Sequence, residues 1–142
     1  MNEVTLAEDD LHILCQELKN ILQDRYVVLL QGDIGSGKTT LVRHFVESFD
    51  TTTRVNSPTF SLSLAYDNPH YGVIYHYDMY RKSLREMLEL GLLDMLMQEG
   101  LHFIEWGDEN LGQILKQNGF QVIFIHITPT PSHHRIYEVS HE

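Results

Sequence analysis

Cysteine is almost absent from this sequence, and its scarcity limits where the chain can work. The 142 residues include one cysteine, Cys15, so no disulfide can form within the chain. Disulfides belong to oxidising compartments, whereas an unpaired thiol suits the reducing cytoplasm. We therefore expect a cytoplasmic protein, with Cys15 in the core of a helix.

Long apolar runs are also missing. No stretch approaches the ~20 apolar residues that a membrane-spanning helix needs. The opening "MNEVTLAEDD" is acidic and polar, whereas a secretory signal needs a basic start and then an apolar run. The sequence therefore predicts neither a membrane span nor a secretory signal.

Basic residues are few, because ten Lys and Arg stand against twenty Asp and Glu, a formal net charge of -10. Binding to nucleic acid depends mainly on neutralising phosphates, so this balance argues against a large direct contact with DNA or RNA. A small basic pocket is still compatible with it. The nine histidines show no zinc-site spacing, and we expect them on the solvated surface.

The sequence does contain alternating segments of helical and strand pattern, as expected of an α/β domain. Hydrophobic residues make up 42% of the chain, enough for a core, and we expect one domain over residues 1–142. Apolar residues recur with helical spacing in 9–22, 38–49, 83–100 (interrupted at Gly91) and 108–119. Strands are predicted at 26–31, 61–66, 72–78, 101–106, 120–129 and 134–140. The polar segment 50–60 is predicted to be a loop.

One glycine-rich turn carries the clearest functional signal. In "YVVLLQGDIGSGKTTLVRHF", residues Gly32–Thr39 match G-x-x-x-x-G-K-S/T at every fixed position. Glycines let successive amide N–H groups turn inward around a phosphate, and the following helix points its positive end at the same anion. Lys38 can reach the β- and γ-phosphates, and the Thr39 hydroxyl can ligate Mg²⁺. We predict a nucleoside triphosphate site rather than an ordinary strand-to-helix turn.

A phosphate loop alone does not separate a kinase, a hydrolase and a switch, so further groups are needed. Two carboxylates follow apolar runs at predicted strand ends, Glu105 after "LHFI" and Asp78 after "VIYHY", where a magnesium-directed carboxylate belongs. Either can instead cap a helix or join a salt bridge. Thr59, behind Pro58 in "NSPTF", can turn its hydroxyl towards Mg²⁺ or the γ-phosphate, or serve only the turn.

Five segments, taken in order, resemble the TsaE family: "GDIGSGKTTLVR", "NSPTFSLSLAY", "YHYDMYR", "LELGLLD" and "FIEWGD". TsaE proteins are bacterial P-loop ATPases required for threonylcarbamoyladenosine formation in tRNA. The resemblance runs from about Leu11 to Arg135, and the combination of "SPTF", "HYDMYR" and "EWGD" is specific to the family. It implies a P-loop NTPase domain with a central mixed β-sheet flanked by helices.

The resemblance also implies a set of site residues. The nucleotide-binding loop would comprise Asp33, Ile34, Gly35, Ser36, Gly37, Lys38, Thr39 and Thr40. Thr39 and Glu105 would ligate Mg²⁺. Thr59 would approach the γ-phosphate, and Asp78 would position metal or water. Together with Lys38, the residues Thr59, Asp78 and Glu105 form the expected catalytic set.

Three further positions follow from the same resemblance. Arg135, in "SHHRIYEV", corresponds to a late arginine that contacts the nucleotide. Trp106 follows the acidic residue as in the family, and both a packing role and a nucleotide or partner contact are open for it. Ser36 replaces the alanine common in this loop, and its side chain is expected to point away from the phosphate.

In function, the resemblance implies an ATPase that uses ATP and Mg²⁺ and acts beside two larger proteins, TsaB and TsaD. The chain would reach tRNA through that complex, and ATP turnover would reset the complex rather than perform the transfer. No arginine finger is evident, so turnover alone should be slow, since a group supplied in trans adds ~10³–10⁵ in rate. Arg81 and Arg85 can supply it, but we expect them in surface pairs or a partner contact.

Two other functional classes stay open. A small-molecule kinase needs an acceptor pocket and an arginine-rich lid, and between Lys82 and Glu99 the chain adds only Arg85. A nucleotide-gated binding module would hold ATP without meaningful hydrolysis. ATP turnover that requires a small acceptor would indicate the kinase, and an absence of phosphate release would indicate the module.

Overall fold

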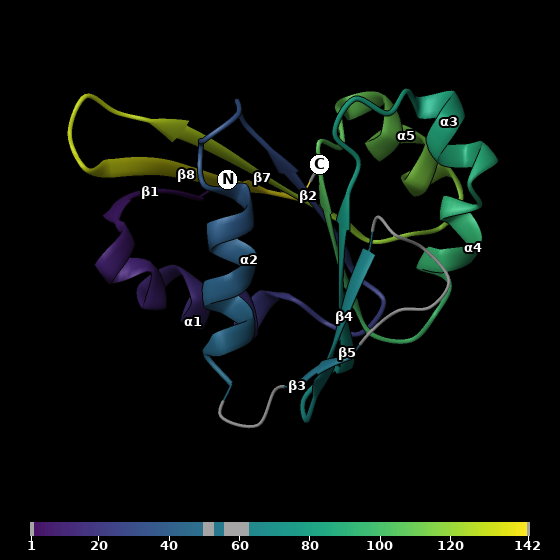
Figure 1. The fold of residues 1–142 in the computed structure, drawn as a ribbon, viewed down its shortest axis with the longest axis horizontal. Helices are drawn as coiled ribbons and strands as arrows, with labels where there is room; N and C mark the ends of the chain where they lie inside the picture. The colour runs from purple at the N-terminus through teal and green to yellow at the C-terminus, as the bar shows by residue number, and fades with distance from the viewer. Residues whose placement is uncertain (1, 50–52, 56–62, 142) are drawn as a thin grey trace.

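A computed structural model describes residues 2–49, 53–55 and 63–141 (Figure 1). The strands are β1 Asn2–Ala7, β2 Val27–Gln31, β3 Thr53–Val55, β4 Ser63–Asn68, β5 Gly72–Asp78, β6 Leu101–Glu105, β7 Val122–Pro129 and β8 His134–Ser140. A 3-10 helix, η1, spans Glu8–Asp10. The α-helices are α1 Leu11–Ile21, α2 Lys38–Glu47, α3 Leu84–Glu89, α4 Leu92–Leu96 and α5 Glu109–Gln117. Within the described ranges, none of these helices is long and apolar enough to span a membrane.

All the strands join one sheet, whose middle is parallel and whose edges are antiparallel. The strand order is β1-β8-β7-β2-β6-β5-β4-β3. β2 pairs in parallel with β6 and β7, and β6 pairs in parallel with β5. The β1–β8, β7–β8, β3–β4 and β4–β5 pairs are antiparallel. The sheet is therefore mixed, which confirms the predicted α/β fold with flanking helices.

Two hydrophobic layers cover the faces of the sheet. Figure 1 shows α1 and α2 on one side and α3, α4 and α5 on the other. Val28 and Leu30 of β2 pack into the layer beneath α1 and α2, whereas Val27 and Leu29 pack into the opposite layer. Side chains alternate between the faces of a strand, so the fully buried run of β2 serves both layers.

Several local predictions hold in detail. Cys15 is buried in α1, as expected, and burial raises the pKa of its thiol to about 11. Gly91, with φ 86°, separates α3 from α4 at the predicted interruption. β4 and β5 pair as a hairpin, and the side-chain oxygen Oδ1 of Asn68 accepts from the backbone N–H groups of His70 and Tyr71 in its turn.

Two strands were not expected from the sequence. The acidic opening of the chain forms β1, which pairs with β8, and Thr53–Val55, predicted to be loop, pairs with β4. Each is an outer strand, and β1 takes its hydrogen bonds from a strand at the far end of the sequence. Strand formation of this kind depends on the neighbouring strand as well as on local pattern, so these short segments did not predict it.

The expectation that the histidines lie on the surface is wrong for His76 and His102, which are both buried. His102 donates from Nε2 to the Gln98 carbonyl at 2.9 Å, so its Nδ1 accepts from the Tyr77 hydroxyl at 2.8 Å. Burial lowers the pKa of His102. The ring is a neutral core residue stacked against Tyr75 and Tyr77.

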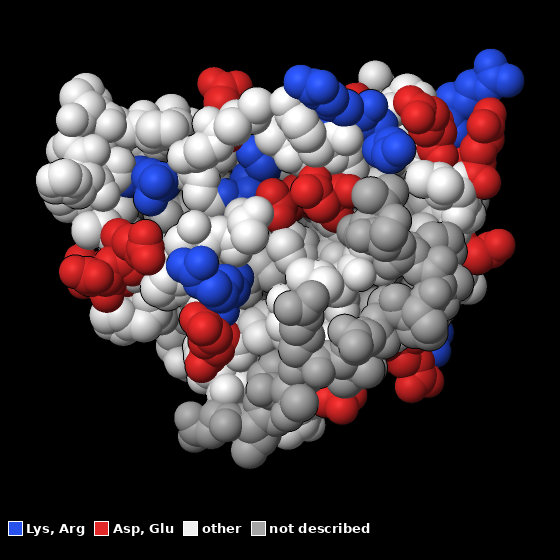
Figure 2. Space-filling model, viewed as in Figure 1, with Lys and Arg blue, Asp and Glu red and all other residues white. Residues whose placement is uncertain are grey.

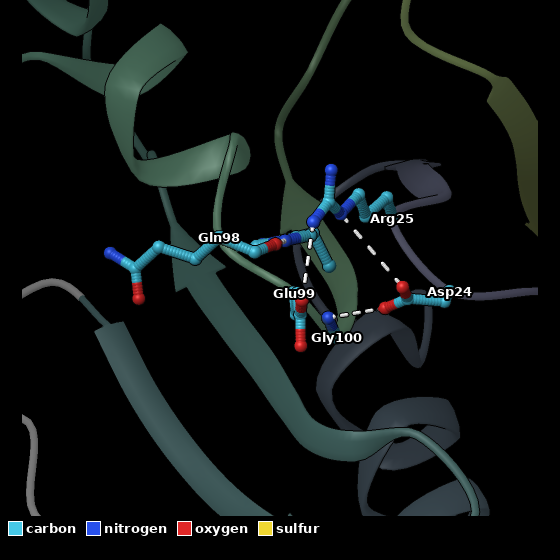
Figure 3. A network of polar contacts seen from close by, with 6 residues as sticks. Asp24, Arg25, Gln98, Glu99 and Gly100 are labelled. Carbon is cyan, nitrogen blue, oxygen red and sulfur yellow. Dashed lines mark hydrogen bonds and ion pairs between the residues drawn. The ribbon is translucent and has the colours of Figure 1, made fainter.

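A polar network ties the starts of β2 and β6 together (Figure 3). The Gly100 amide donates to Asp24 Oδ1 at 2.6 Å, and the Arg25 amide donates to the Gly100 carbonyl at 2.6 Å. The Arg25 guanidinium pairs with Glu99 at 3.3 Å. A Cβ at Gly100 would stand 2.4 Å from the Val73 carbonyl oxygen, so glycine is required there. These contacts help to set β2 against β6, whose carboxyl ends carry the site.

Candidate functional site

A cleft of about 350 Å³ opens at the carboxyl ends of β2, β5 and β6. Parallel strands bring their carboxyl ends to one edge of a sheet, so residues far apart in the sequence meet there. The lining residues come from the β2–α2 loop and the first turn of α2, from the ends of β5 and β6 and the residues just after them, and from β8. They are Ile34, Gly35, Gly37, Lys38, Thr39, Thr40, Asp78, Tyr80, Glu105, Trp106 and Arg135.

The loop between β2 and α2 has the backbone of an anion cradle. Gly35 and Gly37 have φ angles of 79° and 111°, which glycine adopts readily, and Gly37 is the N-cap of α2. Ser36 is buried, and a Cβ at Gly32 would stand 2.6 Å from its Oγ. Its side chain therefore points into the protein. Asp33 and Ser36 are the two predicted loop residues that do not line the cleft.

Lys38 is a buried cation, with only 4% of its surface exposed. Its Nζ donates to the Gly32 carbonyl at 2.6 Å and to the Asp33 carbonyl at 3.0 Å. The same atom stands 3.7 Å from the centre of the Trp106 ring, a cation–π contact. Burial lowers the pKa of Lys38, and the nearby charges of Glu105 and Asp33 oppose that shift. The charged form of a buried ammonium whose contacts are mainly with neutral groups is stabilised when an anion binds beside it.

Glu105, at the end of β6, accepts hydrogen bonds from two side chains. Thr39 Oγ1 donates to Glu105 Oε2 at 2.7 Å, and His76 donates from Nε2 to the same oxygen. Burial raises the pKa of Glu105, but the hydrogen bonds from His76 and Thr39 and the charge of Lys38 outweigh it and leave that pKa lowered. The carboxylate is therefore ionised and can hold a cation.

His76 is the functional residue that the sequence reasoning missed. It lies on β5 two residues before Asp78, and residues two apart on a strand share a face. The spacing in "YHYD" therefore places a second polar side chain on the same face of the strand as Asp78. A carboxylate can only accept, so the contact with Glu105 requires a proton on His76 Nε2.

Asp78 and Trp106 complete the wall of the cleft. Asp78 and Glu105 are register partners on neighbouring parallel strands, which brings the two predicted carboxylates together. Asp78 Oδ1 accepts from the Tyr80 amide at 3.0 Å. Trp106 has φ 72°, an uncommon angle for a bulky residue, and its ring packs against Tyr80 with centroids 4.9 Å apart. Trp106 thus both packs on Lys38 and lines the cleft.

Arg135 approaches the loop from β8. Its Cδ and Nε lie 3.2 Å from the position that a Cβ on Gly37 would occupy. Its Nε is buried, and within the described ranges it has no hydrogen-bond partner. A buried donor without an acceptor costs about 1–3 kcal/mol. The guanidinium therefore stands beside the phosphate loop with hydrogen-bonding capacity that the protein leaves unused.

Three candidates remain: Thr59, Arg85 and Arg81. Thr59, predicted to approach the γ-phosphate, falls outside the described residues. Arg85 Nε donates to Glu89 Oε1 at 2.8 Å in an exposed pair on α3, as expected of a surface residue. The Arg81 guanidinium lies 5.1 Å from the centre of the Tyr80 ring. In the described part of the chain, Arg135 is therefore the one arginine that lines the cleft.

Replacing His76 tests whether its contact with Glu105 holds the carboxylate in place. His76→Leu removes the donor from a buried site, so we expect the free energy of unfolding to fall by about 1–3 kcal/mol. His76→Gln can still donate from its amide and should recover most of that loss. Urea unfolding followed by circular dichroism measures both values. Equal losses for the two variants would show that ring packing matters, not the hydrogen bond.

Comparisons with known proteins point to one family. The family described as "Threonylcarbamoyl adenosine biosynthesis protein TsaE" matches residues 5–136. The chain is 35% identical over 127 residues to the "tRNA threonylcarbamoyladenosine biosynthesis protein TsaE" of Rickettsia bellii, which covers 88% of this chain and 77% of that protein. Its match to the protein of the same name from Rickettsia typhi is 44% identical over 89 residues and covers 61% of this chain and 60% of that protein.

A solved structure shares the fold. The crystal structure of YdiB from Bacillus subtilis superposes with a TM-score of 0.67 at 21% sequence identity. The superposition covers 99% of this chain and 87% of that one. The arrangement of strands and helices that forms the cleft is therefore found in another solved protein.

Proposed function

Because this chain belongs to the TsaE family, we propose that it binds ATP with Mg²⁺, hydrolyses it slowly, and so supports threonylcarbamoyladenosine biosynthesis in tRNA. The observation that carries the proposal is the meeting of three features at one edge of the sheet. A phosphate-loop backbone, the buried cation Lys38 and the ionised Glu105 all face the same cleft.

The phosphate tail is proposed to lie on the loop, from Asp33 to Thr40. Backbone N–H groups of the loop and the positive end of α2 favour an anion there. Lys38 takes the β- and γ-phosphates, exchanging its carbonyl acceptors for charged oxygens. Arg135 brings a second cation and an unused donor to the side of the loop at Gly37.

The donor set beside the phosphates suits Mg²⁺. Thr39 and Glu105 already touch, Asp78 is the register partner of Glu105, and all three offer the hard oxygen atoms that Mg²⁺ prefers. The described residues include no cluster of three His, Cys, Asp or Glu able to hold a metal alone. Mg²⁺ commonly takes one or two protein ligands and completes its shell with phosphate oxygens and water. When bound, the ion neutralises charge on the phosphates.

Hydrolysis is proposed to proceed by attack of water on the γ-phosphorus. A new P–O bond forms to the water oxygen, the bond to the bridging oxygen breaks, and ADP and inorganic phosphate leave. Asp78 is proposed to orient the water, and Thr59 to approach the γ-phosphate. Arg135 stands by Gly37 rather than at the far end of the tail, so slow turnover without a partner is expected.

The surface favours protein partners over direct contact with RNA. The chain carries a formal net charge of -10, and Figure 2 shows the basic side chains of the described residues on that face in small groups between acidic ones. Affinity for nucleic acid depends on continuous basic areas. We therefore propose that the chain reaches tRNA in the cytoplasm through TsaB and TsaD, and that ATP turnover resets their complex.

Phosphate release from Mg·ATP tests the proposal. We expect slow release by the chain alone and faster release with TsaB and TsaD, since a charge supplied in trans typically adds ~10³–10⁵ in rate. The same mixture with tRNA should form the modified adenosine only when ATP is turned over. Release that depends on a small acceptor would indicate a kinase. No release under either condition would leave a nucleotide-gated binding module.

A further inference from the structure

A second cavity, of about 440 Å³, lies between α5 and the sheet and shares no lining residue with the phosphate cleft. Its walls are one face of α5, the end of β2, and facing positions on β7 and β8. Among its lining residues, the side chains of Glu109, His126 and Glu138 make no hydrogen bond or ion pair within the described part of the chain. These polar groups are therefore available to a ligand.

The charges of the cavity are ordered along α5. Glu109, Gln113 and Lys116 are spaced at i, i+4 and i+7, so they lie along one face of the helix. The helix connects β6 to β7, which both pair in parallel with β2, so α5 runs back against the direction of these strands. Glu109 therefore lies at the edge formed by the carboxyl ends of the strands. Lys116 lies about 10 Å further along the helix, at ~1.5 Å per residue.

The strands place a second carboxylate at the same end as Glu109. Gln31, His126 and Glu138 are register partners across β2, β7 and β8, so they form a row on one face of the sheet. This row lies at the carboxyl-end edge, because Gln31 is the last residue of β2. Glu109 and Glu138 thus border one end of the cavity, and Lys116 borders the other. In its neutral form the His126 imidazole adds one acceptor nitrogen beside the carboxylates.

Phe124 forms the apolar floor of the cavity. Lys116 Nζ lies 5.2 Å from the centre of the Phe124 ring. A Cβ at Gly112 would clash with this ring, so the glycine lets α5 pack directly against it and hold it in place. Gln113 and Ser140, the register partner of Phe124, border the cavity as well, and both can accept a hydrogen bond from a ligand nitrogen.

From this order of charges we infer that the cavity binds a basic amino acid, either free or as the carboxyl-terminal residue of a peptide. The cationic group lies between Glu109 and Glu138, because ammonium and guanidinium groups form strong hydrogen bonds with carboxylates. The ligand carboxylate pairs with Lys116, and the aliphatic stem packs on Phe124. A diamine fits less well, because its second cation meets Lys116, and a simple carboxylic acid lacks the cation that the two glutamates require.

Isothermal titration calorimetry of the full chain tests this site with L-arginine, the dipeptide glycyl-L-arginine, and agmatine, which is arginine without its carboxylate. We expect arginine or glycyl-arginine to bind with a Kd of about 1 mM or tighter, and agmatine to bind at least about 10-fold more weakly. Binding of arginine alone identifies a free amino acid as the ligand, and binding of glycyl-arginine identifies a peptide end. The inference is overturned if neither binds up to about 10 mM, or if agmatine binds as tightly.

Two variants test which end of the cavity holds which end of the ligand. Lys116→Gln removes the partner of the carboxylate, so it should weaken arginine or glycyl-arginine by about 10-fold and leave agmatine within about twofold. Glu138→Gln should weaken every ligand by about 10-fold, because all of them carry the cation. Lys82→Gln and Glu17→Gln remove the same charges outside the cavity and should change no affinity.

Equal losses for the carboxylate ligand and agmatine in Lys116→Gln, or unchanged affinities in Glu138→Gln, would also overturn the site. Because these titrations contain no nucleotide, their result is independent of the proposed ATP binding and hydrolysis.

Discussion

Lys38→Ala is expected to lower the affinity for Mg·ATP by more than about 100-fold. The Lys38 ammonium is proposed to contact both the β- and the γ-phosphate. A hydrogen bond to a charged group contributes about 1.5–3 kcal/mol, so losing two of them exceeds the ~2.8 kcal/mol that corresponds to 100-fold. Support for tRNA modification should disappear together with binding.

The surroundings of Lys38 explain why no neighbour can replace it. Its Nζ already reaches the Gly32 and Asp33 carbonyls at the base of the loop, and the Trp106 ring covers it. Burial lowers its pKa because it disfavours the charged ammonium, and a phosphate bound beside Lys38 would stabilise that charge. Arg135, the other cation of the cleft, approaches from Gly37 and cannot occupy that position.

The matched control is Lys82→Ala, which removes the same charge from a lysine that does not line the cleft. Isothermal titration calorimetry gives the affinities, and urea unfolding shows whether each variant is folded. Lys82→Ala should bind Mg·ATP like the unaltered chain. Tight binding by folded Lys38→Ala would remove the glycine loop from the nucleotide site.

The sequence predicted the parts of this site that depend on local backbone and on strand order. The glycine pattern determines the shape of the loop, so Gly35, Gly37 and Lys38 could be placed without a structure. Asp78 and Glu105 could be named as candidates as well, because each follows an apolar run at a predicted strand end, and the structure brings them together as register partners. Both inferences use rules that hold across many proteins.

Contacts between distant side chains were beyond the sequence. His76 meets Glu105 only because β5 and β6 are neighbours in a particular register, and a lone histidine in a strand does not reveal that. Trp106 adopts a positive φ that its residue type disfavours, and no local pattern predicts it. The edge strand β1 likewise depends on β8 at the other end of the chain. These features arise from tertiary packing.

Glu105→Gln is expected to lower ATP hydrolysis by at least about 100-fold while keeping most nucleotide affinity. Loss of a residue that merely supports a metal ligand costs about 10–100-fold, and loss of the ligand's own charge should cost more. Glutamine retains an oxygen that accepts from Thr39 and His76, so the fold should persist. Phosphate release and calorimetry on the same preparation separate the two effects.

Two further variants isolate the charge of Glu105. Glu105→Ala should lose hydrolysis too, but it leaves the buried donor of His76 without its acceptor, which costs about 1–3 kcal/mol of stability. A loss of turnover in Glu105→Ala would therefore combine an effect on catalysis with an effect on stability. Glu109→Gln makes the same change at an exposed position on α5, away from the cleft, and should hydrolyse ATP normally.

Titration with Mg²⁺ decides whether Glu105 acts on the ion. If the carboxylate is a ligand, Glu105→Gln should need more Mg²⁺ to reach half of its maximal nucleotide affinity, whereas Glu109→Gln should not. Binding rests mainly on Lys38 and the loop amides, so Lys38→Ala should lose affinity and turnover together, and Glu105→Gln mainly turnover. Full turnover by Glu105→Gln would remove Glu105 from the metal site and leave Asp78, its register partner, as the candidate carboxylate.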